Sequence, residues 1–191
     1  MYSATQKPFP SIDLGDFILR EQQDKDVANF FKYYTDPEVN RYILTEVPQT
    51  LEDARRELYY WRNCFYNNDG IYFAIANKQN DEMIGSIGLT SYNNYNNRIE
   101  LSYDMAQEYW RRGIMTKATL ATIKYGFKIL QVNRIEAVTS IYNEASVRLL
   151  EKCGFKYEGR LRQHRYHRGK LVDVYMFSIL KQEFNFSGDL F

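Results

Sequence analysis

Cysteine and histidine are scarce in this sequence of 191 residues, which has two of each. Cys64 and Cys153 stand far apart and form no Cys-x-x-Cys pair. Together with His164 and His167 they match no familiar spacing of zinc ligands. We therefore expect two small buried thiols in a reducing compartment, and no metal site.

Excess charge of either sign and long apolar runs are also lacking. Lys and Arg number 25 and Asp and Glu 24, a net charge of +1, so no overall field favours nucleic acid or a membrane surface. No stretch approaches the roughly 18 apolar residues of a membrane span. The N-terminus lacks the charged start and the following apolar run that are typical of a signal peptide. These absences are typical of a cytoplasmic protein.

The sequence does contain enough apolar material for one sizeable core, with 45% hydrophobic residues. Helical and β-type segments alternate along it, without an internal repeat, a low-complexity stretch or a linker. We expect one α/β domain over residues 1–191, with a loosely held lead-in over 1–15 and a tail over 185–191.

Capping residues mark the expected helices. Thr50 and Asp53 form a capping-box pattern, Asp24 is a plausible cap, and Asn143 precedes a helix that Gly154 follows. The predicted helices cover 24–35, a short turn after Asp36, 50–65, 114–130 and 143–153. The predicted strands cover 16–21, a hairpin of 71–78 and 82–92, 97–105, 133–142, and a hairpin of 160–180 around Arg168 and Gly169.

The junction that precedes the helix from Ile114 has features of an anion site. Arg111 and Arg112 supply positive charge, and Gly113 permits a close approach to the backbone. A helix start adds backbone N–H groups without intrahelical partners and a partial positive charge. The alternative is an ordinary loop with two solvated arginines.

Five segments, in this order and at this spacing, resemble a known family. They are "DPEVNRYI", "YFAIANKQNDEMIGSIGL", "IELSYDMAQEYWRRGIMTKA", "NRIEAVTSIYNEASVRLLEKCGF" and "YEGRLRQHRYHRGKLVDVYMFSIL". The chain resembles the GNAT superfamily of acyl-CoA-dependent N-acetyltransferases, in the branch that includes the RimJ and RimL ribosomal-protein acetyltransferases. The resemblance implies the acyl-CoA N-acyltransferase fold, a mixed, mostly antiparallel sheet that is splayed in the middle and flanked by helices.

The resemblance also implies a site for acetyl-CoA, whose pyrophosphate would bind backbone N–H groups of one segment. That segment comprises Trp110, Arg111, Arg112, Gly113, Ile114, Met115 and Thr116. Trp110 stands where the family often has Gln or Arg, and Met115 replaces a small residue, so Gly113 must provide most of the close approach. Asn143 matches an asparagine that binds the pantetheine arm, although it also suits a helix cap.

Transfer to an amine needs a base, an oxyanion site and an acid. Glu100 matches a glutamate that serves as the base in many members, with pairing to Arg98 as the alternative. A backbone N–H between Tyr103 and Met105 would hold the oxyanion. Ser146 matches a position proposed to protonate the thiolate. Many members use a tyrosine there, and Tyr142 is close in sequence.

A basic run lies in the last hairpin, and we expect it to be solvated or to contact an acidic or RNA-rich partner. It consists of Arg160, Arg162, His164, Arg165, His167, Arg168 and Lys170. Strand alternation would place Arg160, Arg162 and His164 on one face and Arg165 and His167 on the other. Glu158 is a secondary candidate for recognition of the amine.

The resemblance predicts an enzyme that transfers the acetyl group of acetyl-CoA to a primary amine by direct attack in a ternary complex. The acceptor would be a small molecule or a protein N-terminus, such as a ribosomal one. Two alternatives stay open, a catalytically silent CoA-binding sensor or scaffold, and an RNA- or ribosome-associated protein that uses residues 160–170. A homodimer formed by a sheet edge or by C-terminal exchange is compatible with the sequence.

Overall fold

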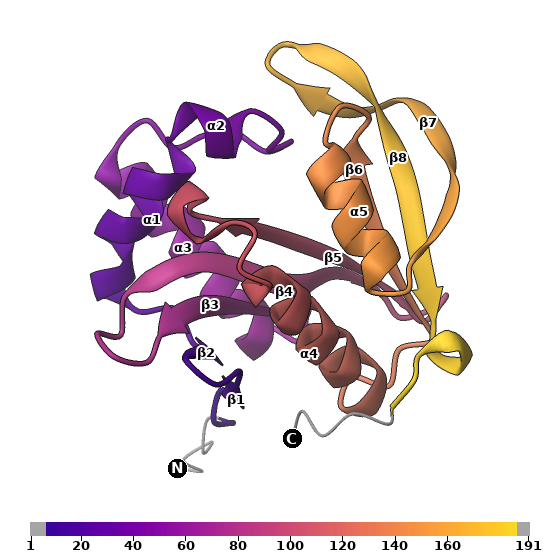
Figure 1. The fold of residues 1–191 in the computed structure, drawn as a ribbon, viewed down its shortest axis with the longest axis horizontal. Coiled ribbons are helices and arrows are strands. Elements are labelled where there is room, and N and C mark those ends of the chain that lie inside the picture. The colour runs from indigo at the N-terminus through magenta and orange to yellow at the C-terminus, as the bar shows by residue number, and fades with distance from the viewer. Residues whose placement is uncertain (1–6, 187–191) are drawn as a thin grey trace, which may run out of the picture.

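A single eight-stranded sheet organises the chain in the computed structural model, which describes residues 7–186 (Figure 1). The strand order is β1-β2-β3-β4-β5-β6-β8-β7, and every neighbouring pair is antiparallel except β5 and β6. The strands are β1 (Ile12–Asp13), β2 (Phe17–Arg20), β3 (Ile71–Asn77), β4 (Met83–Asn93), β5 (Arg98–Met105), β6 (Arg134–Ser140), β7 (Lys156–His167) and β8 (Lys170–Leu180). This mixed, mostly antiparallel sheet confirms the expected fold class.

Most of the helices begin where the sequence places their caps. Thr50 and Asp53 form the predicted capping box, and the Asp36 carboxylate accepts a 2.8 Å bond from the backbone N–H of Glu38. Gly154, past the end of α5, has the expected positive φ of 91°. The α-helices are α1 (Val27–Tyr34), α2 (Pro37–Asn40), α3 (Leu51–Tyr66), α4 (Ile114–Lys128) and α5 (Glu144–Lys152), with short 3-10 turns at Asp24–Asp26, Gln107–Tyr109 and Lys181–Glu183.

The two faces of the sheet pack against different helices. Ile71, Phe73 and Ile75 of β3 belong to the larger core cluster, which includes much of α4. Ala74 points to the opposite face and packs in a second cluster with residues of α1 and α3. The central strands are therefore covered on both sides, by α4 on one face and mainly by α1 and α3 on the other, while Phe65 at the end of α3 packs in the larger cluster.

The sheet splits between β5 and β6. These strands pair in parallel only from Arg98 to Glu100, opposite Arg134 to Glu136. The rest of β5 stays bonded to β4, and the rest of β6 stays bonded to β8. Beyond Glu100 the two strands diverge, with α1 and α2 on one side and the β7–β8 hairpin on the other (Figure 1).

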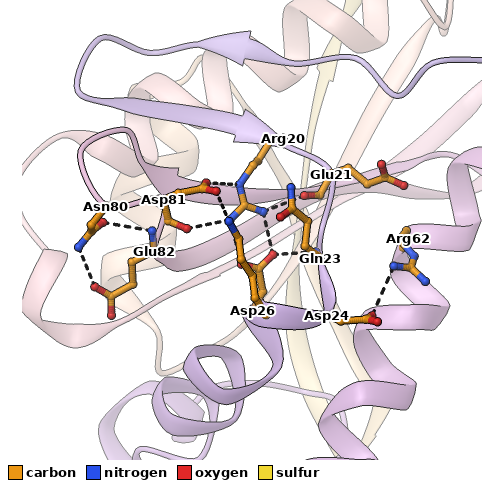
Figure 2. A network of polar contacts seen from close by, with 10 residues as sticks. Arg20, Glu21, Gln23, Asp24, Asp26, Arg62, Asn80, Asp81 and Glu82 are labelled. Carbon is orange, nitrogen blue, oxygen red and sulfur yellow. Dashed lines mark hydrogen bonds and ion pairs between the residues drawn. The ribbon is translucent and has the colours of Figure 1, made fainter.

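A buried ion-pair network near the N-terminus corrects one expected cap (Figure 2). Asp26, rather than Asp24, accepts a hydrogen bond from the backbone N–H of Gln23 at the start of this helical segment. The guanidinium of Arg20 forms two bonds to Asp26, of 2.7 and 2.8 Å, and one of 2.7 Å to Asp81. Asp26 is preferred because its carboxylate serves the helix start and the buried Arg20 together.

The ends of the chain are partly outside the described residues. Residues 1–6 of the expected lead-in and 187–191 of the expected tail lie there. Within the lead-in, Ile12 pairs with Leu19 of β2, and Ile12 and Leu14 are buried, so this part is packed rather than loose. Within the tail, the Phe186 ring contacts Phe127 of α4.

Both cysteines are free and buried, as expected. Burial raises the pKa of the Cys153 thiol to about 11, so the thiol is protonated at neutral pH and packs as a small apolar group. Across residues 7–186, no helix combines the length and the apolar composition that crossing a membrane requires.

Candidate active site

The loop before α4 exposes backbone N–H groups. Arg111 and Gly113 have positive φ angles of 61° and 76°, and Gly113 caps the helix in the left-handed conformation. The first intrahelical bond runs from the N–H of Lys117 to the carbonyl of Gly113. The N–H groups of residues 114–116 therefore have no intrahelical acceptor. A Cβ built on Gly113 would meet no atom within 4 Å apart from those of its chain neighbours, so the backbone is open there to a ligand.

The two departures from the family pattern both have structural explanations. The Met115 side chain is buried in the core cluster, so it does not cover its own backbone N–H. The indole N–H of Trp110 donates a 2.8 Å hydrogen bond to the carbonyl of Met105, at the end of β5. Trp110 thereby connects the loop to the end of β5, one of the two strands that diverge at the splay.

Three cations surround this loop. Arg111, Arg112 and Lys117 form no ion pair with any acidic side chain in residues 7–186, and the Arg112 guanidinium lies 5.3 Å from the centre of the Tyr109 ring. A hollow of about 320 Å³ adjoins the start of α4 and is lined by Asp16, Phe17, Asn77, Gln79, Arg112 and Lys117, among others. The loop is thus electropositive and accessible, as an anion site requires.

A hydrogen bond crosses the splay on the α4 side of the sheet. The hydroxyls of Tyr103, on β5, and Ser146, on α5, are 2.7 Å apart. Burial raises the pKa of Tyr103 well above its ordinary value, so its hydroxyl stays protonated. Asn143 caps α5 by accepting a 3.1 Å bond from the N–H of Ser146, whereas Tyr142 is 74% exposed. The structure thus joins two predicted residues, Tyr103 and Ser146, that are far apart in sequence.

The opposite face of β5 carries Glu100, Ser102 and Asp104, because alternation directs their side chains away from α4. Glu100 is not paired with Arg98. Its carboxylate forms an ion pair of 2.5 Å with Arg165 of β7, and Arg98 bonds to Glu136. The predicted base therefore lies on the expected strand, but in contact with the hairpin.

An aromatic wall lies on the same face. Tyr72, Gly88 and Ser102 stand side by side on β3, β4 and β5. A Cβ on Gly88 would lie 2.1 Å from the Tyr72 ring, so only glycine lets this ring cross β4. The Ser102 hydroxyl donates a 3.2 Å bond to the Tyr72 hydroxyl, and Trp61 of α3 stacks on Tyr72 with ring centres 4.5 Å apart.

Sequence reasoning missed Asp104. Its carboxylate accepts 2.7 Å hydrogen bonds from the hydroxyls of Tyr33 and Ser86, and burial raises its pKa to about 6. The available signal was its alternation with Glu100 on one strand. The pattern could not reveal that Tyr33, on a different element, would cover this position.

The hairpin reaches across toward α2. The Arg168 guanidinium donates a 2.9 Å bond to the Asn40 side chain, and Arg160 pairs with Asp173 within the hairpin. An irregularity between Leu161 and Arg165 interrupts the simple alternation that was expected. Arg160, Arg162 and His164 are exposed, whereas Arg165 and His167 are half-buried.

Glu158 lies at the other end of the hairpin. Its carboxylate bonds to Arg134 and to the Ser178 hydroxyl, beside the paired start of β6. The Glu158 carboxylate therefore has partners within the protein and needs no acceptor amine to explain its position.

Comparisons with known proteins agree with this geometry. The acetyltransferase (GNAT) domain family matches residues 16–156. The chain is 34% identical over 173 residues to the uncharacterized N-acetyltransferase YoaA of Bacillus subtilis (strain 168), an alignment that covers 91% of this chain and 98% of YoaA. It is 27% identical over 148 residues to the spermidine N(1)-acetyltransferase of Vibrio cholerae, with 76% and 84% covered.

A solved structure shares the fold. The ribosomal-protein-S5-alanine acetyltransferase from Vibrio fischeri matches with a TM-score of 0.79 at 21% identity, covering 92% of this chain and 99% of that one.

Proposed function

Since this chain belongs to the acetyltransferase (GNAT) family and is an acetyl-CoA-dependent acetyltransferase, we propose that its acceptor is a primary amine that attacks the thioester directly in a ternary complex. The observation that carries the proposal is the splay between β5 and β6, which has an anion-type loop on one side and carboxylates on the other. A thioester that enters from the loop and an amine that enters from the opposite face would meet at β5.

The loop supports the cofactor half of the proposal. The pyrophosphate of acetyl-CoA would accept hydrogen bonds from the N–H groups of residues 114–116, with Arg111 and Arg112 adding positive charge. The pantetheine arm would then run along the splay toward Tyr103 and Ser146, past Asn143. A backbone N–H between Tyr103 and Met105 would stabilise the developing oxyanion.

The acceptor is proposed to be an α-amine, such as a protein N-terminus. An α-amine with a pKa near 8 is about one fifth neutral at cytosolic pH, whereas an alkylamine with a pKa near 10.4 is about one thousandth neutral. The analogy to ribosomal-protein acetyltransferases supports an N-terminal acceptor. The similarity to a spermidine acetyltransferase supports an alkylamine as the second candidate.

Calorimetry and turnover together test this function. Acetyl-CoA is expected to bind the full chain with micromolar affinity. The protein is then tested with three amines, a peptide with a free N-terminal alanine, spermidine and lysine. It is expected to release CoA thiol with at least one of them. Binding without turnover of any amine would identify a CoA-binding sensor or scaffold instead. Failure to bind acetyl-CoA would remove the cofactor half of the proposal.

Ser146 and Tyr103 are proposed to protonate the leaving thiolate as a pair. Ser146→Ala and Tyr103→Phe are each expected to lower kcat by about 10-fold, because either change breaks their shared hydrogen bond. The double variant should be little worse than either single one, since the two groups act as a unit. Steady-state kinetics on the three proteins measures this.

Tyr142→Phe is the matched control. Because the Tyr142 side chain is exposed, removal of its hydroxyl group should change kcat by less than about 2-fold. A larger loss in Tyr142→Phe than in Ser146→Ala would transfer the acid role to Tyr142.

A further inference from the structure

Asp104 is a half-buried residue whose carboxylate accepts hydrogen bonds from two hydroxyl groups. Its Oδ1 accepts a 2.7 Å hydrogen bond from Tyr33, and its Oδ2 accepts one of 2.7 Å from Ser86. Ser86 is its direct neighbour in the β4–β5 ladder, whereas Tyr33 comes from α1. Two elements therefore fix the carboxylate while a part of the residue stays accessible.

No positive charge in the described chain neutralises this carboxylate. Among residues 7–186, no Lys, Arg or His forms an ion pair with Asp104. The titratable groups that face it are Tyr33 and Tyr34 of α1, Glu57 of α3 and Tyr72 of β3. Burial raises the pKa of all three tyrosines, so they stay neutral hydroxyls, and Glu57 adds a further negative charge.

A desolvated carboxylate without a cation is unfavourable unless a ligand supplies the positive charge. Burial, opposed by the two hydroxyl donors, leaves the pKa of Asp104 at about 6. Its oxygens are therefore mostly ionised at neutral pH and can still accept a proton. An acceptor amine arrives as an ammonium ion, which is the charge that the site lacks.

Glu100 is in a different position. It lies where β5 is still paired with β6, opposite Glu136, and its carboxylate is in an ion pair with Arg165. Asp104 lies beyond the splay point, next in sequence to Tyr103 and on the opposite face from it. Of the two carboxylates, Asp104 is thus nearer to the backbone segment proposed for the thioester.

We propose that Asp104 is the general base of the acetyl transfer, and that Glu100 instead holds Arg165, and with it the β7–β8 hairpin, beside the acceptor. This inference rests on the proposed function, because it needs an amine that attacks a thioester. Asp104 is then a catalytic residue that contacts the reacting nitrogen, while Tyr33 and Ser86 are positioning residues.

The proton and electron balance is simple. The acceptor ammonium donates a hydrogen bond to Asp104 and transfers one proton to it. The neutral nitrogen forms a bond to the thioester carbon, the carbon–sulfur bond breaks, and its electron pair leaves on the CoA sulfur. The nitrogen loses a second proton, the sulfur gains one, and Asp104 returns its proton to water. The products are an N-acetyl amide and CoA thiol.

The basicity of Asp104 also bears on the acceptor class. Proton transfer to a carboxylate of pKa about 6 is unfavourable by about 100-fold from an α-ammonium group of pKa near 8. From an alkylammonium group of pKa near 10.4, it is unfavourable by about 25,000-fold. The less basic α-amine is therefore the better match.

The test compares Asp104→Asn with Glu100→Gln, two isosteric changes, in the full chain. Thiol release is measured from about pH 5.5 to about pH 9 with a peptide that has a free N-terminal alanine and with spermidine. Titration with acetyl-CoA and thermal unfolding accompany the kinetics. Asp104→Asn should bind acetyl-CoA like the wild type and unfold at no lower temperature, because asparagine removes a desolvated charge.

The expected result is a pH-dependent loss. Wild-type kcat should decrease when the pH falls below about 6. Asp104→Asn should lose about 100-fold in kcat near neutral pH. This loss should become smaller as the pH approaches the pKa of the acceptor amine, because more of the amine is then already neutral. Glu100→Gln should raise KM while it keeps the wild-type pH profile.

Three outcomes would contradict the inference. A normal kcat for Asp104→Asn with an active wild type, or a pH-dependent loss in Glu100→Gln alone, overturns the role of Asp104 and leaves the proposed function intact. A wild type that binds acetyl-CoA but acetylates neither amine overturns the proposed function and the inference together.

Discussion

Gly113→Trp is expected to weaken acetyl-CoA binding by at least about 100-fold while the protein stays folded. Gly113 caps α4 with a φ of 76°, and a Cβ there would meet no atom within 4 Å apart from those of its chain neighbours. If the pyrophosphate lies against the N–H groups of α4, the indole would take its place. Isothermal titration with acetyl-CoA measures the effect.

The chain offers a closely matched control for this change. Gly169, at the tip of the β7–β8 hairpin, has a φ of 77° and also has no neighbour within 4 Å of a built Cβ. Tryptophan at either position carries the same left-handed backbone strain, about 1–2 kcal/mol. Gly169→Trp should therefore bind acetyl-CoA normally. Equal affinities for both variants would place the pyrophosphate elsewhere.

Arg20→Met is expected to lower the free energy of unfolding by about 3–5 kcal/mol. The side chains of Arg20 and Asp26 are only 10% and 1% exposed, and their two hydrogen bonds are supplemented by a bond from Arg20 to Asp81 (Figure 2). Methionine retains most of the apolar stem but leaves the Asp26 carboxylate buried without its cation. Urea unfolding measures the change.

An exposed arginine provides the comparison. Arg148 pairs with Glu144 along α5, with side chains 70% and 80% exposed, so Arg148→Met should change stability by less than about 0.5 kcal/mol. A loss below about 1 kcal/mol in Arg20→Met would mean that water replaces the guanidinium. Because Asp26 immediately precedes α1, the same network also supports the helix that carries Tyr33 to Asp104.

Several features of the fold were predictable because their causes are local. A capping box such as Thr50 with Asp53 involves residues only three apart in sequence. The glycine after α5 is needed at a single position, where the backbone has a positive φ. The strand pattern likewise placed Glu100 on β5, and the start of the helix at Ile114 placed the two arginines directly before α4. Asp24 does not cap its helical segment, because the cap is Gln23, whose backbone N–H bonds to Asp26, and the distant Arg20 holds Asp26 in place.

The sequence alone determined the main helices, the strands other than β1, the family and the candidate loop, since each is encoded by residue type and short spacing. Only the tertiary structure decided which side chains meet, because strand register and helix placement set those contacts. Tyr33 reaches Asp104 across 71 positions, Tyr103 reaches Ser146 across 43, and Arg165 reaches Glu100 across 65. Hydrophobic periodicity carries no information over such separations, so the choice between Glu100 and Asp104 arises only once the chain is folded.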